Sequence, residues 1–371
     1  KCCDRNPPSI SQMERGGTTM MDNGRYYIEK LTEFDDHDFV SFIHNGKTGL
    51  SGFIAIHRGS ATRPSFGATR FWQYASEGDA LSDALRLSRM MSYKAALAGL
   101  PYGGAKAVIL QHGDLTPTQR KKLFRSYAEK VNYFAGRFIT GTDVGMNQSD
   151  IKAMARVSPY FVGLKVDPTK YTAIGLFHSI KACLDEVYGS PEIRDRSFAI
   201  QGLGKIGYEL LRQLYREGGR ITVAEINIER LDAVKRAFPR IEITTPQLIH
   251  TQKVDVFSPC ALNHSLTFKN ISKLRCAMIV GGANNQLETD EVGELLNKLG
   301  ILYAPDYVVN AGGLISVVDE YENKTFSADR LKRRIARVGE NVKKILHQSR
   351  LQKKATNTIA NDMAQKIFNA K

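Results

Sequence analysis

The sequence predicts an α/β protein of two domains: an N-terminal α/β domain, and a second domain built on a doubly wound parallel sheet. The chain has 371 residues, more than one compact domain usually contains. From about residue 172 onward, short apolar segments alternate with segments of helical periodicity. This alternation is typical of a parallel sheet with crossover helices. A glycine-rich turn, Gly202–Gly207, separates one such apolar segment from a helical one.

The N-terminal half begins with a predicted strand over residues 50–58, "LSGFIAIHR". Residues 77–98 predict a helix, because apolar residues recur at helical spacing and Gly99 is a natural C-terminal stop. The run "AKAVIL", residues 105–110, predicts the next strand. A second helix is expected over residues 117–135, after Thr116 and Pro117.

The stretch "RFITGTDVGMNQSDI" predicts a strand, a turn and the start of a helix that Ser149 or Asp150 caps. The second half then opens with a predicted helix over residues 172–188. The alternating elements that follow are a strand at 197–201, a helix at 206–217 and strands at 220–225, 254–258, 277–281 and 301–304.

The turn Gly202-Leu203-Gly204-Lys205-Ile206-Gly207 matches the GxGxxG pattern and lies in the strand–turn–helix context that gives this pattern meaning. The first glycine permits the tight turn, the second lets the backbone approach a pyrophosphate, and the third lets helix and strand pack closely. The helix N-terminus favours the anion. The sequence therefore predicts a Rossmann-type dinucleotide site.

Glu225 ends the strand that follows the glycine turn and its helix. A carboxylate at this place accepts hydrogen bonds from the ribose hydroxyls and repels a 2′-phosphate, which favours NAD over NADP. Arg230 lies nearby and could tolerate a phosphate, so use of NADP stays open.

Lys94 and Lys106 lie in segments that otherwise have the composition of a core, and such lysines are either ion-paired or functional. A charged lysine can bind a carboxylate, and a second lysine beside it is pushed toward neutrality and can act as a general base. Asp143, in the turn "TGTDVG", is a candidate proton donor or acceptor. Gly103 and Gly104 are expected to let a substrate approach the backbone beside Lys106. Lysines with a purely structural role remain an alternative.

Several separated motifs resemble the amino-acid dehydrogenase superfamily that includes the glutamate, leucine, valine and phenylalanine dehydrogenases. The resemblance runs from about residue 25 to the C-terminus and is strongest to the leucine/valine/phenylalanine branch. The motifs that carry it are "FGATRFW" (66–72), "SYKAALAGLPYGGAKAVI" (92–109), "ITGTDVG" (139–145), "AIQGLGKIG" (199–207), "VFSPCAL" (256–262), "GGANNQL" (281–287) and "APDYVVNAGGLISVVDE" (304–320).

The resemblance implies a role for each matching position. Lys94 matches the lysine that binds the substrate carboxylate, Lys106 the catalytic lysine that activates water, and Asp143 the aspartate that exchanges a proton with the amino group. The positions that match the cofactor site are Gly202, Leu203, Gly204, Lys205, Ile206, Gly207, Glu225, Thr172, Asn284 and Asn310. The remaining substrate-binding positions are Gly67, Phe66, Gly141, Asn285, Leu314 and Val317.

By resemblance the reaction is the reversible, NAD-dependent oxidative deamination of an amino acid to a 2-oxo acid and ammonia. The positions that match the side-chain pocket carry no charge, so a glutamate side chain would be buried unpaired. Gly141 makes room in this pocket, whereas Phe66 and Leu314 fill it. Leucine, valine or isoleucine is the first expectation, and phenylalanine or tryptophan is the alternative. Ala68 and Ala105 stand where family members usually carry glycine, and each adds one methyl group.

The expected domain division follows from these positions. Residues 1–19, rich in Pro, Ser, Gly and Thr, are predicted to be a disordered leader. Residues 20–164 with 346–371 form the predicted substrate-binding and oligomerisation domain, and residues 165–345 the predicted NAD-binding domain. Family members are homo-oligomers, which is also the expectation here.

Nucleic-acid binding, 2-hydroxy-acid oxidation and a non-catalytic role are the alternatives to this function. The net charge of +14 suggests nucleic-acid binding, but much of the excess lies in residues 324–371, which predict an amphipathic helix with a basic solvated face. No nucleic-acid partner is therefore expected. A 2-hydroxy-acid dehydrogenase would need a catalytic histidine, and His57, His112, His178 and His264 lack a suitable setting. A protein that senses NAD or binds nucleic acid without turnover is the non-catalytic alternative.

The five cysteines, Cys2, Cys3, Cys183, Cys260 and Cys276, form no CxxC pair. This usage predicts unpaired thiols in the cytoplasm and no metal site. The sequence lacks an apolar run of about 20 residues, so no membrane helix is expected.

Overall fold

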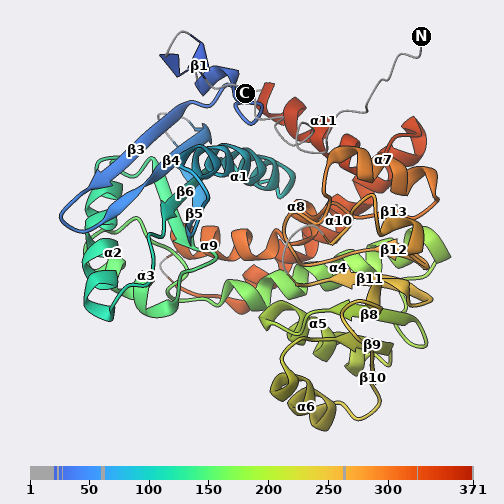
Figure 1. Cartoon of the computed structure of the whole chain (residues 1–371). Helices are drawn as coiled ribbons and strands as arrows, with labels where there is room; N and C mark the ends of the chain where they lie inside the picture. The colour runs from blue at the N-terminus through green and yellow to red at the C-terminus, as the bar shows by residue number, and fades with distance from the viewer. Residues whose placement is uncertain are drawn as a thin grey trace, which may run out of the picture.

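The computed structural model describes residues 21–22, 25–26, 28–59, 63–261, 265–323 and 325–369. These residues form two large sheets and a short hairpin of β1 (Met21–Asp22) and β2 (Arg25–Tyr26). The two large sheets lie on opposite sides of the molecule, with long helices between them (Figure 1). The expected leader, Cys2, Cys3 and His264 fall outside the described residues.

The N-terminal sheet has five strands in the order β3-β4-β6-β5-β7. The strands are β3 (Phe39–Asn45), β4 (Leu50–Arg58), β5 (Ser65–Trp72), β6 (Gly103–Leu110) and β7 (Phe138–Thr142). β4 runs antiparallel to β3 and β6, whereas β6, β5 and β7 run parallel to one another. The predicted strand 50–58 is confirmed, and the predicted strand 105–110 begins earlier, at Gly103.

Helices cover both faces of this sheet. α1 (Glu77–Leu97) packs on β4 and β6 and ends before Gly99, whose φ of +68° is left-handed, as a helix stop requires. α2 (Pro117–Asn132) contributes Leu123, Phe124 and Tyr127 to the core on the other face. α2 ends before the predicted residue 135, because Ala135 and Gly136 both adopt positive φ angles.

The cap of α3 (Gln148–Ala155) differs from the expected one. The Asn147 side chain accepts hydrogen bonds from the N–H groups of Ser149 and Asp150, at 2.9 and 3.0 Å. The Asp150 carboxylate reaches back to the Asn147 N–H at 2.8 Å, which completes a capping box. The expectation that Ser149 or Asp150 is the N-cap was therefore wrong, because their own N–H groups are the ones that are capped.

The second sheet has six strands, all parallel, in the order β10-β9-β8-β11-β12-β13. Counted from β8 this is 3-2-1-4-5-6, the order of dinucleotide-binding sheets that bind their ligand where the order reverses. The strands are β8 (Ser197–Gln201), β9 (Arg220–Ala224), β10 (Glu242–Ile243), β11 (Val254–Pro259), β12 (Cys276–Ile279) and β13 (Leu302–Tyr303). The connecting helices include α5 (Lys205–Arg216), α6 (Ile228–Ala237), α7 (Asp290–Lys298) and α8 (Asp306–Val309). The predicted doubly wound, Rossmann-type sheet is confirmed.

Three long helices lie between the two sheets (Figure 1). They are α4 (Pro168–Tyr188), α9 (Gly312–Glu322) and α10 (Ala328–Gln352), which pack on one another. α4 begins before the predicted residue 172, because Asp167 caps it and Pro168 occupies its first turn. The final helix, α11 (Thr356–Asn369), packs against both α1 and α7. The two-domain α/β fold is confirmed, whereas the residue limits given to the domains stay a prediction; the limit at residues 345 and 346 falls inside α10.

The basic helix α10 has the amphipathic pattern that the sequence predicts. Leu331, Ile335, Val338, Val342 and Ile345 are all buried. Part of its positive charge is neutralised within the chain, since both Arg330 and Arg334 pair with Asp319, and Arg350 pairs with Glu186. No helix among the described residues is long and apolar enough to span a bilayer.

Candidate active site

A cavity of about 180 Å³ lies between the two sheets, with walls from β5, α1 and β7 on one side and from α4, α5 and α9 on the other. Sequence reasoning singled out nine of the residues that line it. They are Gly67, Lys94, Gly141, Thr172, Ile206, Asn284, Asn310, Leu314 and Val317. Residues that are far apart in the sequence thus meet in one cleft, which we call the interdomain cleft.

Lys106 and Asp143 form a buried ion pair beside this cleft. Lys106 lies on β6 and is 5% exposed, and its Nζ donates to Asp143 Oδ2 at 2.6 Å. Asp143 directly follows β7, two residues after the cleft-lining Gly141. Because side chains alternate along a strand, Lys106, Arg70 on β5 and Gly141 face the same side of the sheet, the side that α1 covers.

Burial and neighbouring charges lower the pKa values of both members of this pair, which favours the neutral form of the amine but the ionised form of the carboxylate. Burial, the largest effect, lowers the pKa of Lys106, although the nearby Asp143 opposes it. Burial alone would raise the pKa of Asp143, but the positive charges of Lys106 and Arg70 hold that pKa far below its ordinary value. The neutral form of the amine is therefore made more accessible, while the carboxylate is kept ionised.

Lys94 comes from the last turn of α1 and lines the interdomain cleft. Burial lowers the pKa of Lys94 to about 8, against the attraction of Asp306, and the like charge of Lys106 lowers it further. Asp306 begins α8 in the second half of the chain. Lys94 is thus still mostly protonated at neutral pH and can bind a carboxylate. Lys106, beside it, can become neutral and act as a general base.

Gly103 and Gly104 serve packing rather than substrate approach, which corrects the expectation from the sequence. A Cβ atom on Gly104 would lie 2.0 Å from the backbone nitrogen of Ser92 in α1. A Cβ atom on Gly103 would lie 1.6 Å from the carbonyl oxygen of Arg58 in β4. The two glycines therefore let α1 and β4 lie close to β6, and this close packing brings α1, with Lys94, near Lys106.

The glycine turn between β8 and α5 has the geometry of a dinucleotide site. Gly202 adopts a φ of +88°, and a Cβ atom on Gly207 would lie 2.0 Å from the Gly202 carbonyl oxygen. A Cβ atom on Gly204 would meet only open space, and no side chain among the described residues caps the N-terminus of α5 there. The first N–H groups of α5 are thus available to a pyrophosphate, and the exposed Lys205 lies beside them.

Glu225 lies across this turn, immediately after β9. Its side chain is 4% exposed and accepts hydrogen bonds from the N–H of Leu203 at 2.8 Å and from Arg230 at 3.2 Å. Burial would raise the pKa of Glu225, but hydrogen bonds from the N–H groups of Asn227 and Leu203 hold it below its ordinary value. An ionised carboxylate therefore lies at the end of β9 beside the glycine turn, with Arg230 as its partner. The residues present fit a dinucleotide.

Two of the predicted substrate-binding residues do not line the interdomain cleft. Phe66 is 1% exposed and packs edge-on against Tyr102 and Tyr321 in the core behind the cleft. Asn285 adopts a left-handed φ of +52°, and it is the adjacent Asn284 that lines the cleft. Asn284 accepts a hydrogen bond from Asn310 at 2.7 Å, so these two amides act as one unit.

Sequence reasoning missed Arg70 and Asp306. Arg70 is buried and donates to Asp143, and Asp306 is buried and accepts from the N–H of Gln286 at 2.8 Å, which holds the loop that carries Asn284. Burial raises the pKa of Asp306. A signal was present for both residues: each is a charge inside an apolar segment, the same pattern that singled out Lys106. Among the described residues, no cluster of histidine, cysteine or acidic side chains could hold a metal ion.

Comparison with known proteins matches both halves of this chain to one family. The sequence model of the "Glu/Leu/Phe/Val dehydrogenase, dimerisation domain" matches residues 39–159, and that of "Glutamate/Leucine/Phenylalanine/Valine dehydrogenase" matches residues 163–368. The leucine dehydrogenase of Geobacillus stearothermophilus is 34% identical over 91% of this chain and 92% of its own length. The phenylalanine dehydrogenase of Thermoactinomyces intermedius is 39% identical over 85% of this chain and 86% of its own.

A solved structure gives the same result. The crystal structure of L-tryptophan dehydrogenase from Nostoc punctiforme superposes with a TM-score of 0.78 at 36% identity, covering 90% of this chain and 96% of the other. Fold, cleft and sequence therefore agree with the resemblance found in the motifs. The chain belongs to the glutamate/leucine/phenylalanine/valine dehydrogenase family and is an amino-acid dehydrogenase.

Proposed function

We propose that this protein catalyses the reversible, NAD-dependent oxidative deamination of an apolar L-amino acid to the 2-oxo acid and ammonia. The observation that carries the proposal is the cleft lined by Lys94 and by Ile206 from the glycine turn, with the ion pair of Lys106 and Asp143 beside it. In this proposal Lys94 binds the substrate carboxylate, because it is the cleft cation that stays mostly protonated at neutral pH. Lys106 and Asp143 move protons.

Each residue then has a defined task. NAD, when bound, would accept the hydride that leaves the α-carbon once the ammonium group of the substrate has lost a proton to solvent, so the substrate becomes an iminium ion. Neutral Lys106 takes a proton from water, whose oxygen attacks the iminium carbon, and the 2.6 Å hydrogen bond passes that proton to Asp143. Asp143 donates it to the amino nitrogen, which leaves as ammonia when the C–N bond breaks. Lys106 takes the remaining hydroxyl proton as the carbonyl group forms.

The apolar wall of the cleft supports an uncharged substrate side chain. Met91, Val162, Leu314 and Val317 line this wall, and a buried γ-carboxylate there would lack a partner, at a cost of about 3–5 kcal/mol. We propose branched-chain amino acids first, because the wall is aliphatic and the cavity small. Phenylalanine or tryptophan is the second candidate, supported by the phenylalanine and tryptophan dehydrogenases among the relatives.

A panel of 2-oxo acids, assayed by NADH oxidation in the presence of ammonium, tests this choice. We expect 4-methyl-2-oxopentanoate and 3-methyl-2-oxobutanoate to give the highest kcat/KM. The highest value with phenylpyruvate or indolepyruvate would select the aromatic candidate instead. A preference for 2-oxoglutarate would contradict both. Oxidation that needs no ammonium would support a hydroxy-acid dehydrogenase, and NADH binding without any turnover would support a sensor.

Glu225 supports NAD as the cofactor, since an ionised carboxylate at the ribose repels a 2′-phosphate. Replacing Glu225 with serine is expected to lower the NAD-to-NADP preference at least tenfold, because Arg230 loses its partner and becomes free to pair with the phosphate. Steady-state kinetics with both cofactors measures this ratio. The double variant Glu225→Ser, Arg230→Ala is the control and should bind both cofactors weakly. An unchanged ratio would mean that Glu225 does not face the ribose.

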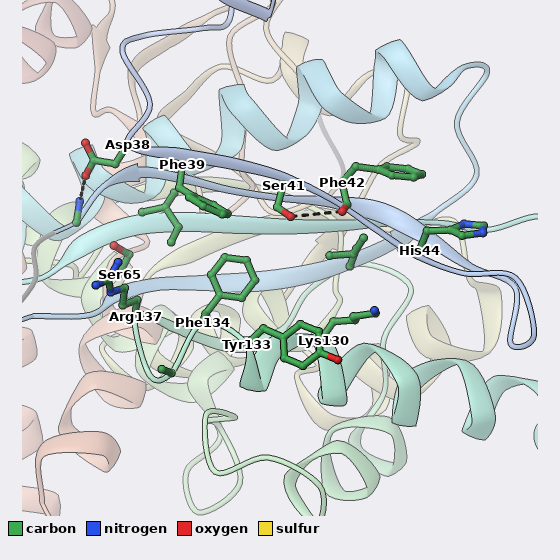
Figure 2. Close-up of a pocket in the computed structure, with 14 residues that line it drawn as sticks. Asp38, Phe39, Ser41, Phe42, His44, Ser65, Lys130, Tyr133, Phe134 and Arg137 are labelled. Carbon is green, nitrogen blue, oxygen red and sulfur yellow. Dashed lines mark hydrogen bonds between the residues drawn. The ribbon is translucent and has the colours of Figure 1, made fainter.

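We also propose that the protein is a homo-oligomer that uses the face along β3. This strand is an edge of its sheet, and a cavity of about 700 Å³ lies between it and the end of α2. Figure 2 shows Phe39, Phe134 and Tyr133 gathered on one side of the strand, with Phe42 turned to the other side. An edge strand with exposed aromatic side chains is suited to pairing with a second copy of this chain. The family model that matches this region is described as a dimerisation domain, which supports a second copy as the partner.

Substituting aspartate for Phe42 is expected to reduce the particle to a smaller species in analytical ultracentrifugation. The added charge would be buried against the second copy, whereas in the single chain the side chain is 52% exposed. Phe268→Asp is the matched control, because Phe268 is equally exposed but belongs to the second half of the chain. An unchanged sedimentation coefficient for Phe42→Asp would rule out this face as the interface.

We propose the cytoplasm as the site of action. Support comes from Cys183, Cys260 and Cys276, which are free thiols. Burial raises the pKa of Cys260 and of Cys276 to about 12 and holds the pKa of Cys183 well above its ordinary value, so these thiols stay protonated and unreactive at neutral pH. Such thiols suit a reducing compartment.

A further inference from the structure

A buried network of charges continues from Asp143 away from the interdomain cleft. The Arg70 guanidinium lies between two carboxylates: Nε donates to Asp143 Oδ2 at 3.1 Å, and Nη1 donates to Asp83 Oδ2 at 2.7 Å. Lys106 donates to the same Asp143 oxygen. The side chains of Arg70, Asp83 and Asp143 are 9%, 13% and 14% exposed. Arg70 is therefore the shared partner of two largely buried anions.

The outer end of the network holds Arg70 in place. Asp83 belongs to α1 and accepts two further hydrogen bonds, from Tyr74 at 2.6 Å and from Arg86 at 2.6 Å. A guanidinium whose donors are committed to fixed carboxylates in a forked geometry has little freedom to turn. Arg70 thus presents its Nε to Asp143 from a fixed position and holds the orientation in which Oδ2 faces Lys106.

The charges in the network explain why the contact between Arg70 and Asp143 matters for proton transfer. Arg70 and Arg86 carry two positive charges, and Asp83 and Asp143 carry two negative ones. Lys106 is the additional cation. Before the reaction begins, when Lys106 is neutral and ready to act as the base, Asp143 is still ionised and buried, and an unpaired buried charge is strongly unfavourable. Arg70 is protonated throughout the accessible pH range, so it keeps Asp143 paired in that state.

We propose that Arg70 is a positioning residue for the deamination reaction: it fixes the Asp143 carboxylate toward Lys106 and remains its counter-ion when Lys106 is neutral. The inference rests on the proposed function and extends it to a residue that does not line the interdomain cleft. Removing Arg70 should therefore make the neutral form of Lys106 harder to reach, not merely loosen the fold.

The electrostatics of Lys106 agree with this role. After burial and Asp143, the positive charge of Arg70 is the next influence on the pKa of Lys106, and it lowers that pKa. Asp83 acts in the opposite direction from α1, as a more distant anion. Lys94, also from α1, is the remaining nearby cation. Loss of the Arg70 charge therefore shifts the pKa of Lys106 upward, and a larger share of the amine is protonated at neutral pH.

The pH dependence of kcat tests the proposal. For Arg70→Met we expect the rising limb of the profile for deamination to move up by at least one pH unit, with kcat for deamination at pH 7 at least tenfold lower and KM for the amino acid within about threefold of wild type. Arg70→Lys keeps a cation at this position, so its rising limb should lie close to the wild-type pH. Arg330→Met is the matched control, because Asp319 is also a buried aspartate with two cationic partners. It should leave the limb in place.

A measurement that needs neither cofactor nor turnover separates the possible failures. Trace labelling of lysines with acetic anhydride over a pH series, read out on the Lys106 peptide, reports where this amine becomes neutral. The midpoint should move up in Arg70→Met and largely return in Arg70→Lys. If Arg70→Met does not fold, Arg70→Lys compared with wild type still tests the proposal: the midpoint should move slightly upward, and kcat at pH 7 should fall slightly. If a folded Arg70→Met variant keeps the wild-type labelling midpoint of Lys106 and the wild-type rising limb of kcat, the proposed role of Arg70 is wrong. A wild-type chain without ammonium-dependent activity would instead overturn the proposed function.

Discussion

Replacing Lys106 with methionine is expected to lower kcat by about a thousandfold, within the range of roughly 10²- to 10⁴-fold that a general base contributes. Methionine approximates the length of the lysine side chain but cannot take a proton from water. The fold should survive, because Asp143 keeps Arg70 as a partner at 3.1 Å. Binding of NAD should also survive, since the glycine turn Gly202–Gly207 lies in the other sheet.

Pre-steady-state and steady-state NADH oxidation measure this loss, and calorimetric titration with NAD measures the binding that should be kept. Lys152→Met, at an exposed position on α3, is a control for the loss of one surface lysine. A Lys106→Met variant that keeps more than a tenth of wild-type kcat would show that another group acts as the base. Loss of NAD binding would point to a damaged fold instead.

The second large effect is expected for Lys94→Met, which should raise KM for the 2-oxo acid about a hundredfold. Truncating one partner of a buried, hydrogen-bonded charge pair typically costs about 2–5 kcal/mol, and each 1.4 kcal/mol is tenfold in affinity. The substrate carboxylate is that partner in the proposed complex. We expect kcat at saturation to fall much less, because Lys106 and Asp143 are still in place.

The pH dependence of KM provides an independent check of the same assignment. Because burial lowers the pKa of Lys94 to about 8, the amine is charged below that pH and loses its charge above it. KM of the wild-type enzyme should therefore rise above about pH 8, and KM of Lys94→Met should be flat there. A flat wild-type KM between pH 7 and pH 10, or an unchanged KM in the variant, would mean that Lys94 does not bind the carboxylate.

Much of the fold could be predicted because its signals are local. The 3.6-residue periodicity ending at Gly99 predicted α1 to within one residue, and the strand β8 was predicted with its observed limits. The glycine turn was predicted because GxGxxG describes backbone geometry within six residues, and the φ of Gly202 and the packing of Gly207 follow from it.

The parts that the sequence did not yield depend on contacts between distant segments. Gly103 and Gly104 were expected beside the substrate, but their neighbours are Arg58 and Ser92, which local patterns cannot supply. The partnership of Arg70 with both Asp143 and Asp83 likewise joins three elements. Even the cap of α3 was missed, because three residues within four positions, Asn147, Ser149 and Asp150, are of a type that can fill that place.

One assay on the wild-type chain tests the proposed amino-acid dehydrogenase reaction most directly: NADH oxidation with an apolar 2-oxo acid, with and without ammonium. We expect oxidation that requires both compounds and saturates with each, because an amino group must be added at the interdomain cleft, beside the pair of Lys106 and Asp143. Oxidation at the same rate without ammonium, or none with any apolar 2-oxo acid, would contradict the proposed reaction.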